Sequence, residues 1–170
     1  FNPLVITESQ YGVVTGQAPN GTAEKIRQWL INNYTGYGIE YVLLIGNPDP
    51  SLGDVPMKKC WPRYDYDTYR DTPTDYFYAD LTGNWDLDSD LYFGEYADDG
   101  GAGGVDFANE VYVGRIPVYS GVSNLDSILA KWISFGTTHP DAINWRRSAL
   151  LPMSFSDSAT DGAYLSENMK

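Results

Sequence analysis

Three aspartates alternate along one short segment of the sequence, and their spacing is typical of cation binding. They are Asp86, Asp88 and Asp90, and Glu95 follows five residues after the last of them. Carboxylates crowded on one loop repel one another: at about 4 Å and an effective dielectric of about 20, each close pair costs on the order of 4 kcal/mol. A hard cation offsets this repulsion, and Ca²⁺ accepts about six to eight oxygen ligands in such loops. The segment therefore predicts a calcium site.

The predicted ligands are oxygens of a single loop. They are the carboxylates of Asp86, Asp88, Asp90 and Glu95 and the backbone carbonyl of Tyr92. An EF-hand would need glycine at the sixth loop position and a bidentate glutamate at the twelfth. Leu91 and Ala97 stand there instead, so we expect a shorter DxDxD calcium loop. Asp80 is a further candidate, for this site or for a neighbouring one, and Mg²⁺ is less suitable because it prefers few carboxylates and several waters.

The surroundings of the aspartates are acidic and aromatic. Between Asp71 and Glu110 the sequence holds eleven carboxylates and no lysine or arginine. The alternative to a metal-bound loop is a solvated acidic segment, but such segments usually lack aromatic residues. Seven aromatic residues lie between Tyr76 and Tyr96. This composition favours a folded loop.

Length, charge and composition limit the class of protein. The 170 residues suit one domain with a real core. A formal net charge of −12 argues against nucleic acid or an anionic membrane as a partner. No apolar run approaches the roughly 18 residues of a membrane span. The acidity and the 14 tyrosines suggest an extracellular or surface protein. Cys60 is the single cysteine, so an internal disulfide is excluded. Because the sequence starts at Phe1 without a signal peptide or an initiator methionine, we expect it to be a piece of a longer protein.

Strand and helix patterns alternate along the chain. The predicted strands are 4–7, 41–47, 110–118 and 148–155, and the predicted helices are 22–34 and 123–136. Such alternation implies right-handed crossovers and a parallel sheet. We therefore expect an α/β three-layer sandwich with a mostly parallel central sheet, in which 41–45 and 111–114 are neighbouring strands. Residues 48–109 form a long excursion rich in Pro, Gly and Asp, which favours a metal-organised loop. The residues expected between sheet and helices are Leu43, Leu44, Val111, Val113, Leu129 and Trp132.

Four segments, in order along the chain, resemble the gingipain-type cysteine peptidases. They are YVLLIGN at 41–47, VP at 55–56, TDYFYADLTGNWDLDSDLYFGE at 74–95 and NEVYVGRIPV at 109–118. The resemblance implies a caspase-like fold, in which a first α/β subdomain precedes a second one that carries the catalytic histidine and cysteine. It also implies a protein that is secreted or attached to the cell surface and that is stabilised by calcium.

The resemblance divides the chain into two parts. Residues 1–147 correspond to the first subdomain, with the calcium-binding excursion at 48–109, and residues 148–170 begin a truncated catalytic subdomain. We expect a structural subdomain of a secreted endopeptidase, whose partners are the remaining catalytic subdomain and, through it, a protein or peptide substrate. The alternative is a non-catalytic calcium-binding surface or adhesion module that binds glycans through its aromatic residues. A nucleotide-binding domain fits poorly, because IGNPDP lacks both glycine-rich phosphate-binding motifs.

One cysteine and one histidine are present, but their contexts do not suggest a catalytic pair. In the gingipain-type family the histidine lies in an H-G segment after a strand and the cysteine follows another strand. Cys60 lies in MKKCWPR and His139 in TTHP, and nothing in the sequence directs one toward the other as a thiolate nucleophile requires. We therefore assign no catalytic residue and expect the chain alone to be inactive. Asp157 is the nearest candidate for the family's histidine-orienting acid, although an exposed loop aspartate is the favoured interpretation.

Arg115 is the basic residue closest to the acidic segment on its C-terminal side. It follows a buried strand pattern, and Pro117 comes two residues later. We expect it to form an ion pair with Glu110 or Asp75 rather than to bind the carboxylate of a substrate.

Overall fold

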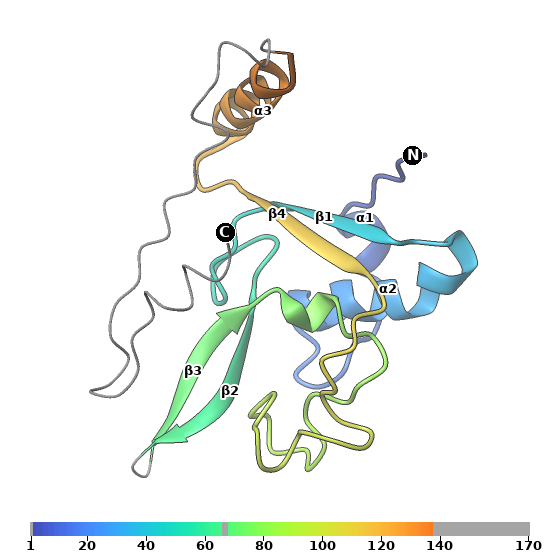
Figure 1. Ribbon diagram of the computed structural model, residues 1–170, viewed down its shortest axis with the longest axis vertical. Coiled ribbons are helices and arrows are strands. Elements are labelled where there is room, and N and C mark those ends of the chain that lie inside the picture. The colour runs from blue at the N-terminus through green and yellow to red at the C-terminus, as the bar shows by residue number, and fades with distance from the viewer. Residues whose placement is uncertain (1, 66–67, 138–170) are drawn as a thin grey trace, which may run out of the picture. The chain divides into compact units, whose positions relative to one another are not determined.

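The computed structural model describes residues 2–65 and 68–137 of the chain. Contacts divide the chain into two units, Phe1–Ile128 and Leu129–Lys170, and each is described by itself. The elements in Figure 1 are α1 (Glu8–Tyr11), α2 (Thr22–Tyr37), β1 (Tyr41–Gly46), β2 (Lys58–Asp65), β3 (Thr68–Thr74), the 3₁₀ helix η1 (Tyr76–Tyr78), β4 (Tyr112–Pro117) and α3 (Val122–Thr137). The strand predicted at 148–155, His139 and Asp157 lie outside the described residues.

The first unit contains a small parallel sheet. β1 and β4 pair in parallel, with Tyr41 opposite Tyr112 and Gly46 opposite Pro117, so the predicted neighbouring strands are confirmed. Helix α2 also forms where its pattern predicts and ends at Gly38, whose φ of 62° is the left-handed conformation of a helix C-cap. The fold is therefore mixed α/β. The sheet has two strands within the described residues, and a three-layer sandwich is not confirmed.

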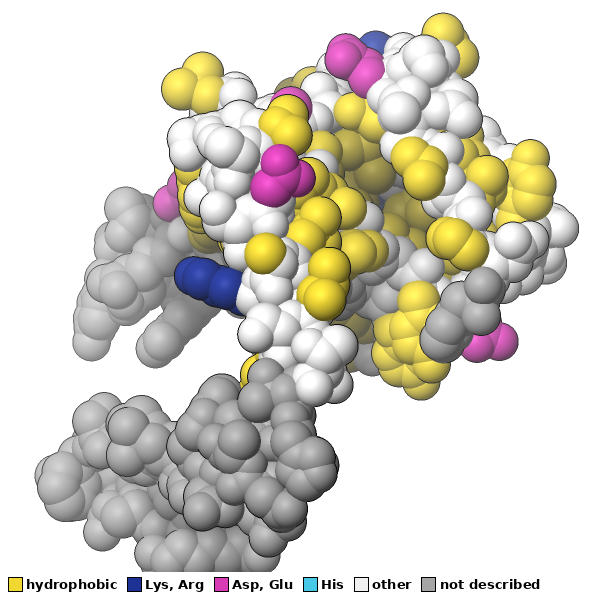
Figure 2. All heavy atoms as spheres, turned by 90° about the horizontal axis from the view of Figure 1, so that it is seen from above, with side chains coloured by type: hydrophobic (Ala, Val, Ile, Leu, Met, Phe, Trp, Pro, Cys, Tyr) yellow, Lys and Arg dark blue, Asp and Glu magenta, His cyan; other side chains and the backbone are white. Residues whose placement is uncertain are grey.

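The parallel sheet is buried on one face. Leu44 is 5% exposed and belongs to the core, but Leu43 is 51% exposed. The prediction that Leu43 is buried was wrong, because side chains of a strand alternate between two faces and only one face of β1 packs against the core. Val111 is buried and Val113 partly so. Leu129 and Trp132 of α3 belong to the second unit, where they are exposed, and their packing against the sheet stays a prediction. Hydrophobic side chains are visible at the surface in Figure 2.

One further predicted element is not formed, and one observed element was not predicted. Residues 4–7 form no strand; they are irregular and lead into α1, and Leu4 and Val5 are exposed. A strand needs a partner for its backbone groups, and none of the described strands lies beside this segment. The excursion 48–109 contains the antiparallel hairpin β2–β3, in which Lys58 pairs with Thr74. Its sequence is largely polar, so the apolar alternation that predicts strands is missing.

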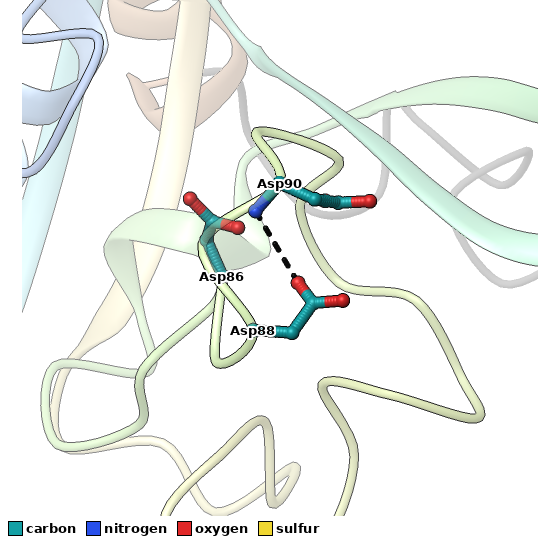
Figure 3. A group of neighbouring side chains, drawn as sticks. All are labelled: Asp86, Asp88 and Asp90. Carbon is teal, nitrogen blue, oxygen red and sulfur yellow. Dashed lines mark hydrogen bonds between the residues drawn. The ribbon is translucent and has the colours of Figure 1, made fainter.

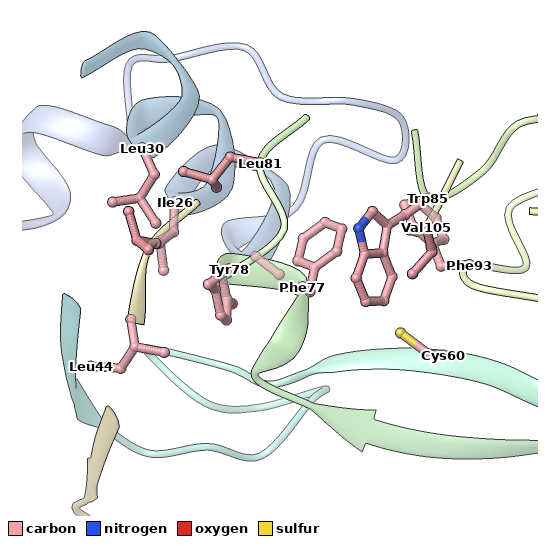
Figure 4. Close-up of a cluster of buried hydrophobic side chains, with 12 residues drawn as sticks. Ile26, Leu30, Leu44, Cys60, Phe77, Tyr78, Leu81, Trp85, Phe93 and Val105 are labelled. Carbon is pink, nitrogen blue, oxygen red and sulfur yellow. The ribbon is translucent and has the colours of Figure 1, made fainter. Parts of the chain in front are cut away.

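Aromatic side chains of the acidic segment build much of the core. The ring of Phe77 lies edge-on to three others, at centroid distances of 5.4 Å to Trp85, 5.6 Å to Tyr78 and 6.0 Å to Phe93 (Figure 4). All four rings are buried. The segment is therefore folded onto the domain, as its aromatic content predicts. None of the helices among the described residues has the length and hydrophobicity to cross a membrane.

Candidate metal centre

The three alternating aspartates come together in the structure. One carboxylate oxygen each from Asp86, Asp88 and Asp90 lies within 4.8 Å of the other two (Figure 3). We call these three residues the aspartate triad. Asp86 is buried, whereas Asp88 and Asp90 are exposed to solvent. The triad thus has one side in the protein and one side open to an incoming ion.

Backbone amide groups shape the turn that carries the triad. Oδ1 of Asp86 accepts a hydrogen bond from Leu91 N at 3.1 Å, and Oδ1 of Asp90 accepts one from Tyr92 N at 2.8 Å. Oδ1 of Asp88 accepts a longer one from Asp90 N at 3.4 Å, drawn dashed in Figure 3. Aspartate favours such bonds to the amide two residues ahead. The DxDxD spacing therefore folds the loop locally as well as supplying ligands.

Leu91 has a backbone conformation that its sequence does not suggest. Its φ is 72°, in the left-handed region, where a residue other than glycine costs about 1–2 kcal/mol. This is the sixth loop position, where an EF-hand has glycine. The leucine backbone therefore makes the turn that glycine would make, and its amide donates to the first aspartate. The absence of glycine at this position therefore does not prevent an EF-hand-like turn. Ala97 still replaces the closing glutamate of an EF-hand.

The other two predicted ligands are not part of the triad. Glu95 is buried and lies outside the group of carboxylates that gather within 4.8 Å among the described residues. Tyr92 contributes its amide to the turn, and its ring contacts Trp61 edge-on at a centroid distance of 5.0 Å. Among the predicted carboxylate ligands, the structure thus brings the three aspartates together. Ligation by Glu95 and by the Tyr92 carbonyl stays a prediction.

Asp80 also lies outside the triad, and it organises the start of the loop. Its fully buried carboxylate accepts hydrogen bonds from Gly83 N at 2.9 Å and from Trp85 Nε1 at 3.1 Å. The guanidinium group of Arg27, on α2, donates to the carbonyl oxygen of Asp80 at 2.7 Å and to that of Gly83 at 2.7 Å. Burial lowers the pKa of Arg27 to about 10, so it remains charged at neutral pH. These contacts fix the loop to α2.

Asp99 is a buried residue of this region that the sequence did not identify. It has no exposed surface, and burial raises the pKa of its carboxyl group although amide donors oppose that effect. In the sequence it stands next to Asp98 and before Gly100, a context that suggests an exposed turn. No local pattern distinguishes it from its neighbour.

Arg115 has the structural role that its position predicts. Its guanidinium group binds Asp75 through two hydrogen bonds, both 2.7 Å long, and a third nitrogen donates to the Val55 carbonyl at 2.7 Å. Glu110, the other predicted partner, accepts hydrogen bonds from Leu81 N and from the Thr82 hydroxyl instead. The ion pair with Asp75 is confirmed, and it joins β4 to the end of the hairpin.

The family of the chain follows from its match along the whole sequence. A family model described as peptidase family C25 matches residues 1–170. The chain belongs to peptidase family C25. This is the gingipain family of cysteine peptidases, so the resemblance carried by the four sequence segments is confirmed. Comparisons with curated proteins and with solved structures found no match.

The cysteine of this family C25 chain is placed as a core residue. Cys60 is 4% exposed and lies beside the aromatic cluster in Figure 4. Burial raises the pKa of its thiol to about 12, and the nearby charge of Lys58 only partly opposes this. A nucleophilic cysteine needs the opposite environment, which lowers the pKa and exposes the sulfur. Cys60 therefore has the environment of a structural core cysteine.

We expect the Cys60 thiol to be inert in the folded chain. At pH 8 an aromatic disulfide reagent such as DTNB should label it only after urea unfolds the protein, because the folded thiol is both covered and protonated. The chain should also show no cleavage of casein or of arginyl and lysyl peptides. Rapid labelling of the native chain, or cleavage that Cys60→Ser abolishes, would contradict this expectation. Cleavage that survives Cys60→Ser would indicate a contaminating peptidase.

Proposed function

We propose that this family C25 chain is the first, structural subdomain of a secreted gingipain-like cysteine endopeptidase. In this proposal residues 1–147 support a catalytic subdomain, which carries the histidine and cysteine and begins at 148–170. The supporting observation is the burial of Cys60, the sole cysteine of a chain that matches a cysteine peptidase family over its whole length. Members of this family are typically extracellular, which supports secretion or attachment to the cell surface.

The proposal extends to the fold. One face of the parallel sheet is exposed. On β1 this face carries Tyr41, Leu43 and Ile45, which alternate with residues of the buried face. Tyr112 of β4 stacks on Tyr41 at a centroid distance of 5.5 Å on the same face. A parallel sheet is normally covered on both faces. This exposed apolar face supports the three-layer sandwich expected from the sequence, with a further layer over it in the whole peptidase.

The proposal also includes a structural Ca²⁺ ion bound by the aspartate triad, the Tyr92 carbonyl and Glu95. The residues fit such an ion because hard carboxylate oxygens gather within 4.8 Å in a loop that tolerates several ligands. The ion would supply positive charge that neutralises the triad. The residues themselves fix the turn through their amide hydrogen bonds. The ion would therefore stabilise the 48–109 excursion, whose aromatic side chains form much of the core.

Calcium should raise the stability of the chain by mass action. A ligand that binds the folded state alone adds about 2.7 kcal/mol at a hundred times its dissociation constant. We expect the melting temperature to rise from EDTA to millimolar Ca²⁺, with a smaller rise in Mg²⁺. Without calcium, the acidic excursion should loosen before the parallel sheet does.

Variants of neighbouring aspartates make this test specific. Asp88→Asn removes one charge of the triad and should reduce the calcium-dependent rise, whereas Asp98→Asn removes an exposed charge outside the triad and should not. Identical melting temperatures in EDTA and in calcium for the wild-type chain would mean that the triad is only solvated. The supporting role has its own test. A longer peptidase that includes the catalytic subdomain should stay active when its Cys60 is replaced by serine.

A further inference from the structure

The carboxylate of Asp99 joins the two ends of the segment that carries the triad. Its Oδ1 accepts a hydrogen bond from Leu87 N at 2.5 Å, and its Oδ2 accepts one from Glu95 N at 3.1 Å. Leu87 directly follows Asp86, the first residue of the triad, and Glu95 lies beyond the last. One buried side chain thus closes the loop from 87 to 95, although Asp99 is not itself in the triad.

The main chain holds Asp99 in this position. Its amide donates to the carbonyl of Glu95 at 2.9 Å, and its own carbonyl accepts from Val105 N at 2.8 Å. Gly104 packs so closely that a Cβ atom there would lie 1.9 Å from the Asp99 carbonyl oxygen, a distance that no side chain permits. The approach of Gly104 and the bond to Val105 therefore fix Asp99 from the C-terminal side. The position of its carboxylate depends on protein contacts alone.

A role in simple core filling does not explain these contacts. Burying a carboxylate costs free energy unless hydrogen bonds compensate, and an apolar side chain of similar size would avoid this cost. The amides of Leu87 and Glu95, at the two ends of the loop, donate to the Asp99 carboxylate, and the amide of Gly94 also favours its ionised form. Hydrogen bonds to charged groups are stronger than those between neutral groups. In its ionised form, the Asp99 carboxylate therefore holds the loop closed more firmly than an amide or a hydroxyl group would.

We propose that Asp99 is the positioning residue of the aspartate triad, which it keeps assembled by closing the loop 87–95. The role of Asp99 in cation binding rests on the proposed function, whereas the closure of the loop by Asp99 requires no ion. The two parts of the inference can therefore be tested separately, the closure in metal-free protein and its consequence with a probe ion.

Amide hydrogen exchange of the metal-free 170-residue chain tests the closure. In Asp99→Asn the amides of Leu87 and Glu95 should exchange about ten to a hundred times faster than in the wild type, because each loses a bond to a charged acceptor. The amide of Leu44, in β1, should not change. Asp98→Asn is the matched control, since it removes the adjacent exposed carboxylate and should leave all these amides unchanged. Unchanged exchange of Leu87 and Glu95 in Asp99→Asn would overturn the proposal.

The wild-type chain provides a measurement that needs no variant. If Asp99 closes the loop, the amides of Leu87 and Glu95 exchange at similar rates and more slowly than the amide of Asp90, which lies within the turn. This comparison decides the closure even if Asp99→Asn does not fold. Rates for Leu87 and Glu95 as fast as that of Asp90 would contradict it.

Terbium luminescence tests the consequence for cation binding. Tb³⁺ binds oxygen sites like those of Ca²⁺, and the indole of Trp85, next to Asp86, can sensitise its emission. Asp99→Asn should weaken Tb³⁺ binding at least about tenfold, and Asp98→Asn should not. Faster exchange in Asp99→Asn with unchanged Tb³⁺ affinity would overturn the positioning role. If the wild-type chain binds no Tb³⁺, the calcium proposal fails, and the exchange rates alone decide whether Asp99 closes the loop.

Discussion

Replacing Lys58 by methionine is expected to destabilise the chain by about 3–5 kcal/mol, because the carboxylate of Glu24 would remain buried without its partner. Nζ of Lys58, on β2, lies 2.5 Å from Oε1 of Glu24, on α2, and the two side chains are 10% and 4% exposed. The same ammonium group lies 3.3 Å from the centroid of the Phe93 ring. The pair thus joins the hairpin to α2 in surroundings that water screens poorly.

The neighbouring lysine provides the control for this prediction. Nζ of Lys59 lies 2.6 Å from Oδ2 of Asp71, but both side chains are 47% exposed. Exposed ion pairs contribute about 0–1 kcal/mol, so Lys59→Met should change the free energy of unfolding by no more than that. Urea unfolding of both variants measures the difference. Equal losses in the two variants would show that the Lys58 pair is not shielded from water.

A double variant separates the cost of an unpaired charge from the value of the pair. Glu24→Gln removes the charge, and its side chain can still accept the hydrogen bond that Gly21 N donates to Oε2 of Glu24 at 2.7 Å. Combining it with Lys58→Met should recover most of the stability lost in Lys58→Met alone, since no buried charge remains. No recovery would indicate that the packing of Lys58 against Phe93, rather than the charge of Glu24, dominates.

Leu44→Ala is expected to destabilise the chain by about 2–5 kcal/mol, the usual range for truncating a buried leucine. Leu44 is 5% exposed and belongs to the same buried cluster as Ile26 and Leu30 of α2. Truncation leaves a cavity between β1 and α2, which the paired strands cannot close without losing their register. Thermal and urea unfolding measure the loss.

Leu43 is the matched control for Leu44. It is the preceding residue of the same strand, and it is 51% exposed. Leu43→Ala removes the same atoms without opening a cavity and should cost less than about 1.5 kcal/mol, since only part of the side chain is buried. A loss as large as that of Leu44→Ala would show that the exposed face of the sheet is covered in solution.

Local sequence patterns predicted the elements that depend on local physics. The apolar run of β1, the pattern of β4 and the helical spacing of α2 each occur where expected, because buried strands and the buried stripe of a helix require apolar residues at such positions. The DxDxD spacing brought Asp86, Asp88 and Asp90 together, since each aspartate bonds an amide ahead of it in the loop. The hairpin β2–β3 was missed because the backbone pairing of two polar strands leaves no apolar period.

Three pairs of identical neighbours show what the tertiary structure alone decided. Leu43 and Leu44, Lys58 and Lys59, and Asp98 and Asp99 are adjacent in sequence, and in each pair one side chain is buried and the other exposed. The sequence determined the family, the parallel strands and the triad. It did not determine which leucine faces α2, which lysine reaches Glu24 or which aspartate closes the loop. Those choices depend on contacts with residues distant in the chain or across the fold, and a local pattern contains no information about such contacts.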